Sequence, residues 1–397
     1  MTDDALYFIE LLSSFLNNSK PPVKEDTDWA KIYSLSNSHD VTAIISTRIA
    51  LLPVEAMPDK RTKSAFNQIL GQTIINYSEK QKNIQKVLNC LTDTEIPHMV
   101  VKGAETSKLY PVPELRTSGD TDIIVRPEDY EKAVEALKDL GLKLQFMKEN
   151  CALMNSEIFN YEIHNCLESI NPKVKALLSE PFSEGKSEKV NNYTYKLNND
   201  FALFYTVIHL LYHLKSGGAG IRMLMDIDVL IRNNKESVKI CLSLAEECGL
   251  LRSFKCVFSL AHHWFSTPVE SSILVNDRVL IEKMTETMMN GGIFGFSNGH
   301  SGAVFLANQQ KANDGKLTFL TRIKAFFHYM FPAPKYIYNQ SEYAREHHFL
   351  LPIAYIDRIF QGIFLRRKHS LKSIDAIRGK NEAAQNLYDI MNELEIN

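Results

Sequence analysis

The sequence has no paired-cysteine motif, no strong excess of charge of either sign and no long apolar run. Six cysteines occur among 397 residues without a Cys-x-x-Cys pair, so neither a disulfide framework nor a zinc site is expected. The 45 Lys and Arg residues nearly balance the 47 Asp and Glu residues, which argues against an extended surface for nucleic acid or for lipid. A local basic groove is compatible with this balance, so tRNA stays a disfavoured alternative partner.

The N-terminal residues do not have the pattern of a targeting signal, because they open with two acids and show helical periodicity. The longest apolar stretch, residues 201–214, is broken by His209 and His213 and is too short to cross a bilayer. We therefore expect a cytoplasmic protein with reduced thiols and without a membrane partner. The sequence does not indicate an oligomeric state.

Three segments differ in the periodicity of their apolar residues. Residues 1–95 show helical spacing and predict an N-terminal helical region. Residues 96–199 alternate short apolar runs with amphipathic stretches, which is typical of a small α/β unit with helices on one face. Residues 200–397 return to helical spacing and predict a C-terminal helical domain. A glycine-rich stretch at 291–302 lacks the spacing of a phosphate-binding motif and is predicted to be a plain loop.

The middle segment contains the expected strands. The expected order is a strand at 97–101, a short helix to residue 110, a strand ending at 123–125, a helix at 130–140 and strands at 142–146 and 158–167. The β-branched residues of the short runs favour strands, and Gly141 ends the amphipathic helix.

Asp120 and Asp122 form the most informative pattern. They stand one residue apart at the start of the apolar strand Ile123-Ile124-Val125. Side chains alternate across a strand, so both carboxylates face the same side. Two such carboxylates suit Mg²⁺, which prefers oxygen ligands and keeps positions open for substrate phosphates. The alternative is a solvated turn that holds two acids.

A third acid is needed for phosphoryl chemistry, either to share the metal or to accept the proton of the attacking hydroxyl. Glu162 is the best candidate, because it lies with His164 on one face of a predicted strand. If this strand pairs with that of Asp120 and Asp122, three carboxylates converge. The alternative for Glu162 is the exposed face of an edge strand, and His164 is expected to orient or pack rather than to bind metal.

Several residues before Asp120 have the chemistry to hold phosphate. Lys102 and Gly103 end a strand and open a short helix, where free N–H groups attract anions. Arg116 could pair with a triphosphate, and Ser118 and Gly119 could contact it through hydroxyl and backbone.

In the helical segment that follows, Arg222 could supply a further phosphate contact, and a pair with Asp226 at helical spacing is the structural alternative. His209 and His213 are four residues apart but lack the acid of a zinc-binding HExxH motif, so packing or cleft-lining roles are favoured.

These motifs, taken together, resemble the bacterial family of uncharacterised nucleotidyltransferases, a branch of the DNA-polymerase-β-like nucleotidyltransferase superfamily. The resemblance rests on the segment 99–104, Arg116 and the segment 120–125, and it continues through these positions: Glu162, His164, His209, His213, Arg222, Asp226, 350–352 and Arg358. It implies an α+β fold whose core is a small mixed sheet with flanking helices, set between the two helical regions. Lys102-Gly103-Ala104 replaces the Gly-Ser that usually precedes the first Asp, so the triphosphate is expected to be held differently.

The resemblance implies transfer of a nucleoside monophosphate from an NTP to a hydroxyl acceptor, with Mg²⁺ or Mn²⁺ held by the three acids. The near-neutral charge favours a small molecule or a saccharide as acceptor. Two alternatives stay open: a γ-phosphotransferase that uses the same metal site, and a non-catalytic nucleotide-binding or scaffold protein that retains the fold.

Overall fold

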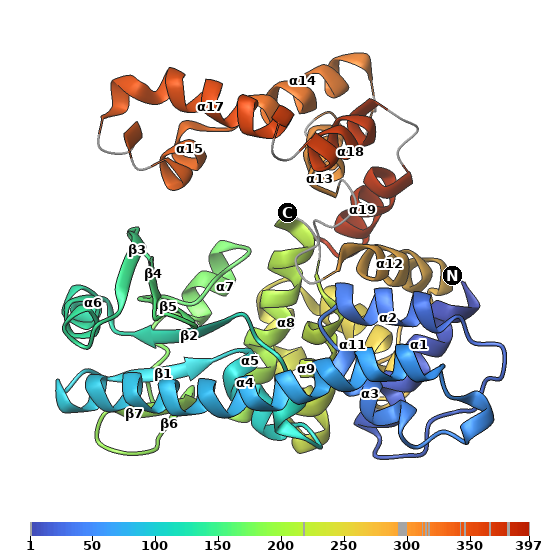
Figure 1. The fold of residues 1–397 in the computed structure, drawn as a ribbon. Helices are drawn as coiled ribbons and strands as arrows, with labels where there is room; N and C mark the ends of the chain where they lie inside the picture. The colour runs from blue at the N-terminus through green and yellow to red at the C-terminus, as the bar shows by residue number, and fades with distance from the viewer. Residues whose placement is uncertain are drawn as a thin grey trace. The chain divides into compact units, whose positions relative to one another are not determined.

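The computed structural model describes residues 2–216, 219–292, 300–311, 313, 316, 318–341, 343–344, 347–364, 367–378 and 382–396 (Figure 1). The chain forms two compact units. The first contains Met1–Tyr212 and Ile221–Asp277, and the second contains His213–Gly220 and Arg278–Asn397. The candidate site lies in the first unit.

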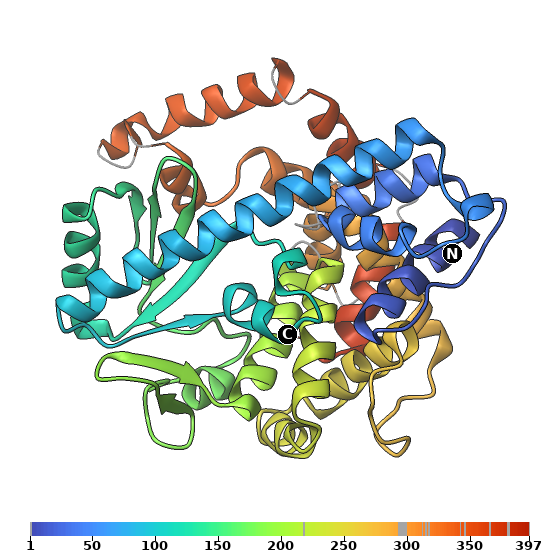
Figure 2. The same cartoon turned by 60° about the horizontal axis from the view of Figure 1, so that its bottom comes forward.

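Four helices make up the N-terminal region: α1 (Asp3–Leu16), α2 (Trp29–Ser38), α3 (Thr42–Ile49) and α4 (Lys60–Asp93). Asp59 begins the long helix α4 by accepting hydrogen bonds from the backbone N–H groups of Arg61 and Thr62. Figure 2 shows α4 running from the neighbourhood of α2 and α3 across the sheet. This helix therefore joins the N-terminal region to the core.

Seven strands form one mixed sheet in the order β3-β4-β5-β2-β1-β7-β6. β2 pairs in parallel with β5, and β1 pairs in parallel with β7, whereas the other pairs are antiparallel. The expected mixed sheet with flanking helices is confirmed. The strands are β1 (His98–Val101), β2 (Asp120–Val125), β3 (Lys143–Met147), β4 (Cys151–Asn155), β5 (Asn160–His164), β6 (Ser187–Lys189) and β7 (Thr194–Leu197).

The two faces of the sheet differ in chemistry. One face packs on α4 and on α6 (Tyr130–Asp139) and carries apolar side chains of alternate residues, among them Ile123, Val125, Tyr161 and Ile163. The residues between these point to the opposite face, because strand side chains alternate. The second face therefore receives the charged side chains of β2 and β5.

Three strands were not predicted. β4 has the sequence Cys-Ala-Leu-Met-Asn and contains no β-branched residue, so its composition does not favour a strand. It forms because it pairs with β3 and β5 on either side. β6 and β7 are short, pair with each other and extend the sheet beyond β1.

The remaining helices of the first unit are α5 (Gly103–Thr106), α7 (Pro172–Leu177), α8 (Asn199–Ser216), α9 (Ile221–Asn233), α10 (Ser237–Glu247) and α11 (Leu251–Phe265), of which α8 continues into the second unit. The α1 helix contacts α9 and α11. The N-terminal helices thus pack on helices that follow the sheet. The division into domains at residues 95 and 199 stays a prediction.

The second unit is helical. Its helices are α12 (Arg278–Gly291), α13 (His300–Lys311), α14 (Phe319–Met330), α15 (Pro334–Gln340), α17 (Leu351–Phe364), α18 (Arg367–Arg378) and α19 (Glu382–Glu393). The loop prediction for residues 291–302 is wrong at Gly291, which ends α12, and at 300–302, where α13 begins; residues 293–299 lie outside the described residues. Among the described residues, no helix combines the length and the apolar character that a membrane span needs.

Candidate active site

The carboxylates of β2 and β5 meet on the polar face of the sheet. The two strands pair in parallel, and Asp122 lies opposite Glu162 in the register. Asp120 is two residues earlier on β2, so its side chain shares the face of Asp122. The strand pairing on which the convergence of three acids depends is therefore present.

Asp122 is the most enclosed of the three acids. Its Oδ1 atom accepts a hydrogen bond from Lys102 Nζ at 2.8 Å and lies 3.1 Å from His164 Nε2. Burial opposes ionisation, but Lys102 and His164 hold the pKa of Asp122 well below its usual value. Asp122 is therefore a carboxylate at neutral pH.

His164 lies between two acids. Its Nε2 atom is 3.1 Å from Asp122 Oδ1 and 3.2 Å from Glu162 Oε2. Burial alone would lower the pKa of His164, but hydrogen bonding to Asp122, Cys151 and Glu162 raises it to about 12. The imidazolium therefore orients both carboxylates. Cys151, Glu162 and His164 also place one sulfur, one oxygen and one nitrogen atom within 4.8 Å of one another, a cluster that the cysteine spacing did not predict.

Asp120 differs from Asp122 in that no other residue in the described part of the chain forms a hydrogen bond or an ion pair with its carboxylate. The residue is exposed by area, but neighbouring protein atoms partly desolvate its carboxyl group. This desolvation, with the charges of Asp122 and Glu162, raises the pKa of Asp120. An unpartnered carboxylate beside two others fits a divalent cation, because a cation would relieve their repulsion.

Lys102 connects β1 to the acids. Its φ angle of 60° is one that residues other than glycine rarely adopt. Its ammonium lies 2.8 Å from Asp122 and 3.5 Å from Glu168. Burial disfavours the charged form, but Tyr205, Asp122 and Glu168 raise the pKa of Lys102 well above its usual value. Lys102 thus contributes a permanent positive charge beside the acids.

Glu168 was not predicted as a site residue. Its Oε2 atom accepts a hydrogen bond from His209 Nδ1 at 2.6 Å and pairs with Lys102. Burial opposes ionisation, but His209 and Lys102 lower the pKa of Glu168 to about 2. Glu168 is half-buried in a loop after β5, where no periodicity marks it as a site residue.

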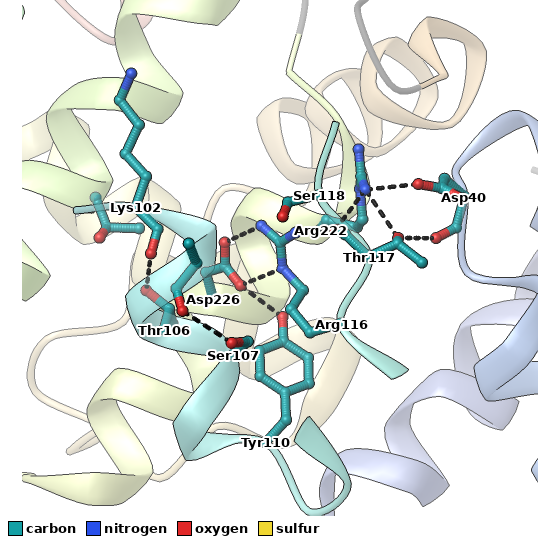
Figure 3. A network of polar contacts seen from close by, with 12 residues as sticks. Asp40, Lys102, Thr106, Ser107, Tyr110, Arg116, Thr117, Ser118, Arg222 and Asp226 are labelled. Atoms are coloured by element: carbon teal, nitrogen blue, oxygen red, sulfur yellow. Dashed lines mark hydrogen bonds and ion pairs between the residues drawn. The ribbon is translucent and has the colours of Figure 1, made fainter. Parts of the chain in front are cut away.

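Gly103 and Arg116 were both expected to contact phosphate, but in the structure they lie against each other. A Cβ atom on Gly103 would lie 2.5 Å from Arg116 Nη2, so the glycine makes room for this guanidinium. Arg116 is buried, and its Nε and Nη2 atoms bind the two carboxylate oxygens of Asp226 at 2.8 and 2.6 Å (Figure 3). Tyr110 donates a third hydrogen bond to Asp226 at 2.7 Å. Arg116 is thus bound within the protein. The helix α5 is a single turn, so few peptide dipoles are aligned at its N-terminus to attract a phosphate group.

Arg222 does not pair with Asp226, so the alternative of an Arg222–Asp226 pair at helical spacing is wrong. Asp226 is saturated by Arg116 and Tyr110, and Arg222 Nη1 instead contacts Asp40 Oδ2 at 2.8 Å and the carbonyl of Thr117 at 2.7 Å (Figure 3). Within the described chain, its Nε and Nη2 atoms have no hydrogen-bond partner. Burial and the nearby Arg116 lower the pKa of Arg222. Its environment therefore favours the approach of an anion.

Ser118 and Gly119 lie in the loop that leads to Asp120, and a lysine that was not predicted contacts this loop. Lys80 of α4 donates hydrogen bonds to Ser118 and to the carbonyl of Asp120. A Cβ atom on Gly119 would meet no atom within 4 Å, so no close contact of the fold requires this glycine. Lys80 could have been found from its spacing: it precedes Ile84, Val87 and Leu91, which form the buried stripe of α4.

The comparison with known proteins points to one family. Residues 25–266 match a family model described as an uncharacterised nucleotidyltransferase. The matched region is more than half of the chain and contains every residue of the site described above. No curated protein and no solved structure matches the chain significantly.

Proposed function

The chain belongs to the family of uncharacterised nucleotidyltransferases, and from this premise we propose that it transfers a nucleoside monophosphate from an NTP to the hydroxyl group of an acceptor, releasing pyrophosphate. The observation that carries the proposal is the pairing of Asp122 with Glu162 on adjacent parallel strands. This pairing gathers the carboxylates on the polar face of the sheet, where Asp120 has no partner of its own.

Asp120, Asp122 and Glu162 would hold Mg²⁺ or Mn²⁺. The bound ion would neutralise the triphosphate and orient the phosphate that is attacked. The side chain of Glu162 is 29% exposed and that of Asp122 is 8% exposed, so Glu162 is the acid better placed to accept the proton of the attacking hydroxyl. His164 would keep Asp122 and Glu162 in position through its hydrogen bonds.

The cations around the acids would bind the triphosphate. Lys102 supplies charge beside Asp122, and Arg222 offers two nitrogen atoms without a partner in the described chain. Ser118 and Gly119 would contribute hydroxyl and backbone contacts, as the sequence predicts. We assign Arg116 and Gly103 to positioning this region, because Arg116 is held by Asp226.

The acceptor that fits this account is a small molecule or a saccharide, because the charge of the whole chain is close to zero. We place the reaction in the cytoplasm, where nucleoside triphosphates and Mg²⁺ occur together and where the six cysteines stay reduced.

The reaction type can be tested before the natural acceptor is known, because water can replace it and hydrolyse the NTP slowly. Each NTP would be incubated with Mg²⁺ and the protein, with the label at the α- or the γ-phosphate. We expect labelled nucleoside monophosphate from the α-labelled NTP and labelled pyrophosphate from the γ-labelled NTP. Nucleoside diphosphate and inorganic phosphate would instead indicate a γ-phosphotransferase. The absence of turnover together with the absence of NTP binding would favour a scaffold protein.

A further inference from the structure

Lys80 places a buried ammonium group against the backbone that leads into β2. Its Nζ atom donates to the Ser118 carbonyl at 3.0 Å, to Ser118 Oγ at 2.8 Å and to the Asp120 carbonyl at 2.7 Å. The residue is only 7% exposed, whereas most charged residues of α4 face solvent. Placing an ammonium group at such a position is costly unless its hydrogen bonds are made.

These three contacts exhaust the donors of Lys80. An ammonium group has three N–H bonds, and each has a partner within the protein. Lys80 therefore has no donor left for a phosphate, and it forms no ion pair with a carboxylate among the described residues. Its effect is on the position of the chain from Ser118 to Asp120.

Asp120 depends on this support more than the other acids do. Asp122 is held by Lys102 and by His164, whereas the Asp120 carboxylate has no partner in the described chain. The hydrogen bond of Lys80 to its carbonyl is therefore the side-chain contact that fixes where Asp120 begins the strand. Mutation of a group that holds a metal ligand in place typically lowers metal affinity by about 10–100-fold.

We propose that Lys80 is a positioning residue of the active site, which fixes the backbone of Asp120 so that its carboxylate is presented to the metal ion. The inference rests on the proposed function. It also gives the N-terminal helical region a part in the reaction, because Lys80 of α4 contacts the backbone at the start of the catalytic strand.

The inference can be tested without an activity assay. Mn²⁺ is titrated into the full chain in the absence of NTP, and its binding is measured by electron paramagnetic resonance. Lys80→Met removes the three donors, and we expect Mn²⁺ to bind about tenfold more weakly, the lower end of the range for such supporting groups. Lys82→Met is the matched control, because Lys82 lies on the same helix, is exposed and pairs with Glu79 on the helix surface. This control should bind Mn²⁺ like the wild type, and Lys80→Arg should recover part of the loss.

The outcomes separate this inference from the proposed function. If wild-type protein binds no Mn²⁺, the proposed function itself fails. If wild-type protein binds Mn²⁺, the Asp120→Asn/Asp122→Asn variant does not, and folded Lys80→Met binds as tightly as wild type, only the role of Lys80 is overturned. Lys80→Gln, whose side chain is shorter and uncharged, is the second variant should Lys80→Met not fold, and weaker Mn²⁺ binding than in the wild type is expected. If neither variant folds, Lys80 is needed for folding alone and the proposal is overturned.

Discussion

Replacing Asp122 with Asn should reduce nucleotidyl transfer by a factor on the order of 10³, because a metal ion contributes several kcal/mol to the stabilisation of a phosphoryl-transfer transition state. The substitution keeps the shape of the side chain and removes its charge. It also leaves the buried cations Lys102 and His164 without the carboxylate that they share. The measurement is the rate of pyrophosphate release at saturating NTP and Mg²⁺.

A matched control variant tests whether the loss of an acidic residue elsewhere in the first unit also lowers the rate. Asp139 ends α6 and is exposed, so Asp139→Asn should keep the wild-type rate. Both variants would be checked for folding by circular dichroism and thermal unfolding. A folded Asp122→Asn protein that retains most of the wild-type rate would remove Asp122 from the metal site.

Breaking the buried Arg116–Asp226 pair should strongly destabilise the first unit. Asp226→Asn leaves the buried guanidinium of Arg116 without a counter-charge, which typically costs about 3–5 kcal/mol. Both tryptophans, Trp29 and Trp264, lie in this unit, so their fluorescence during urea unfolding reports on it selectively. We expect the unfolding midpoint to fall strongly, because the loss is a large part of the usual stability of a folded unit.

The double variant Arg116→Met/Asp226→Leu distinguishes the cost of an unpaired charge from a general loss of packing. Replacing a buried ion pair by apolar residues of similar size is often neutral for stability, so the double variant should recover most of the free energy of unfolding. The hydroxyl of Tyr110 loses its acceptor in this variant, which should leave a residual loss of about 1 kcal/mol. Asp226→Asn with wild-type stability would contradict the account.

The sequence was informative where alternation along a strand decides which face a side chain takes. The pattern Asp-Thr-Asp-Ile-Ile-Val predicted both a strand and two acids on one side of it, and the structure places these residues in β2 with Ile123 and Val125 in the core. The same reasoning applied to Glu162 and His164 on β5. These predictions needed only local geometry.

Contacts between distant parts of the chain could not be predicted in this way. Arg222 and Asp226 have the spacing of a helical pair, but Asp226 binds Arg116, which is 110 residues earlier. The bidentate geometry of a guanidinium with a buried carboxylate outweighs a pair across one helical turn. Lys80 stands on the buried stripe of α4, but a single sequence does not show which backbone carbonyls would satisfy its ammonium group.

The most direct test of the central claim is a calorimetric titration of each NTP into the protein with Mg²⁺, repeated without the metal and with the folded Asp120→Asn/Asp122→Asn variant. The account predicts saturable binding of at least one NTP that requires Mg²⁺ and is lost in the double variant. Failure of every NTP to bind to folded wild-type protein, or binding that persists unchanged in the double variant, would contradict the assignment of the nucleotide site to the polar face of the sheet.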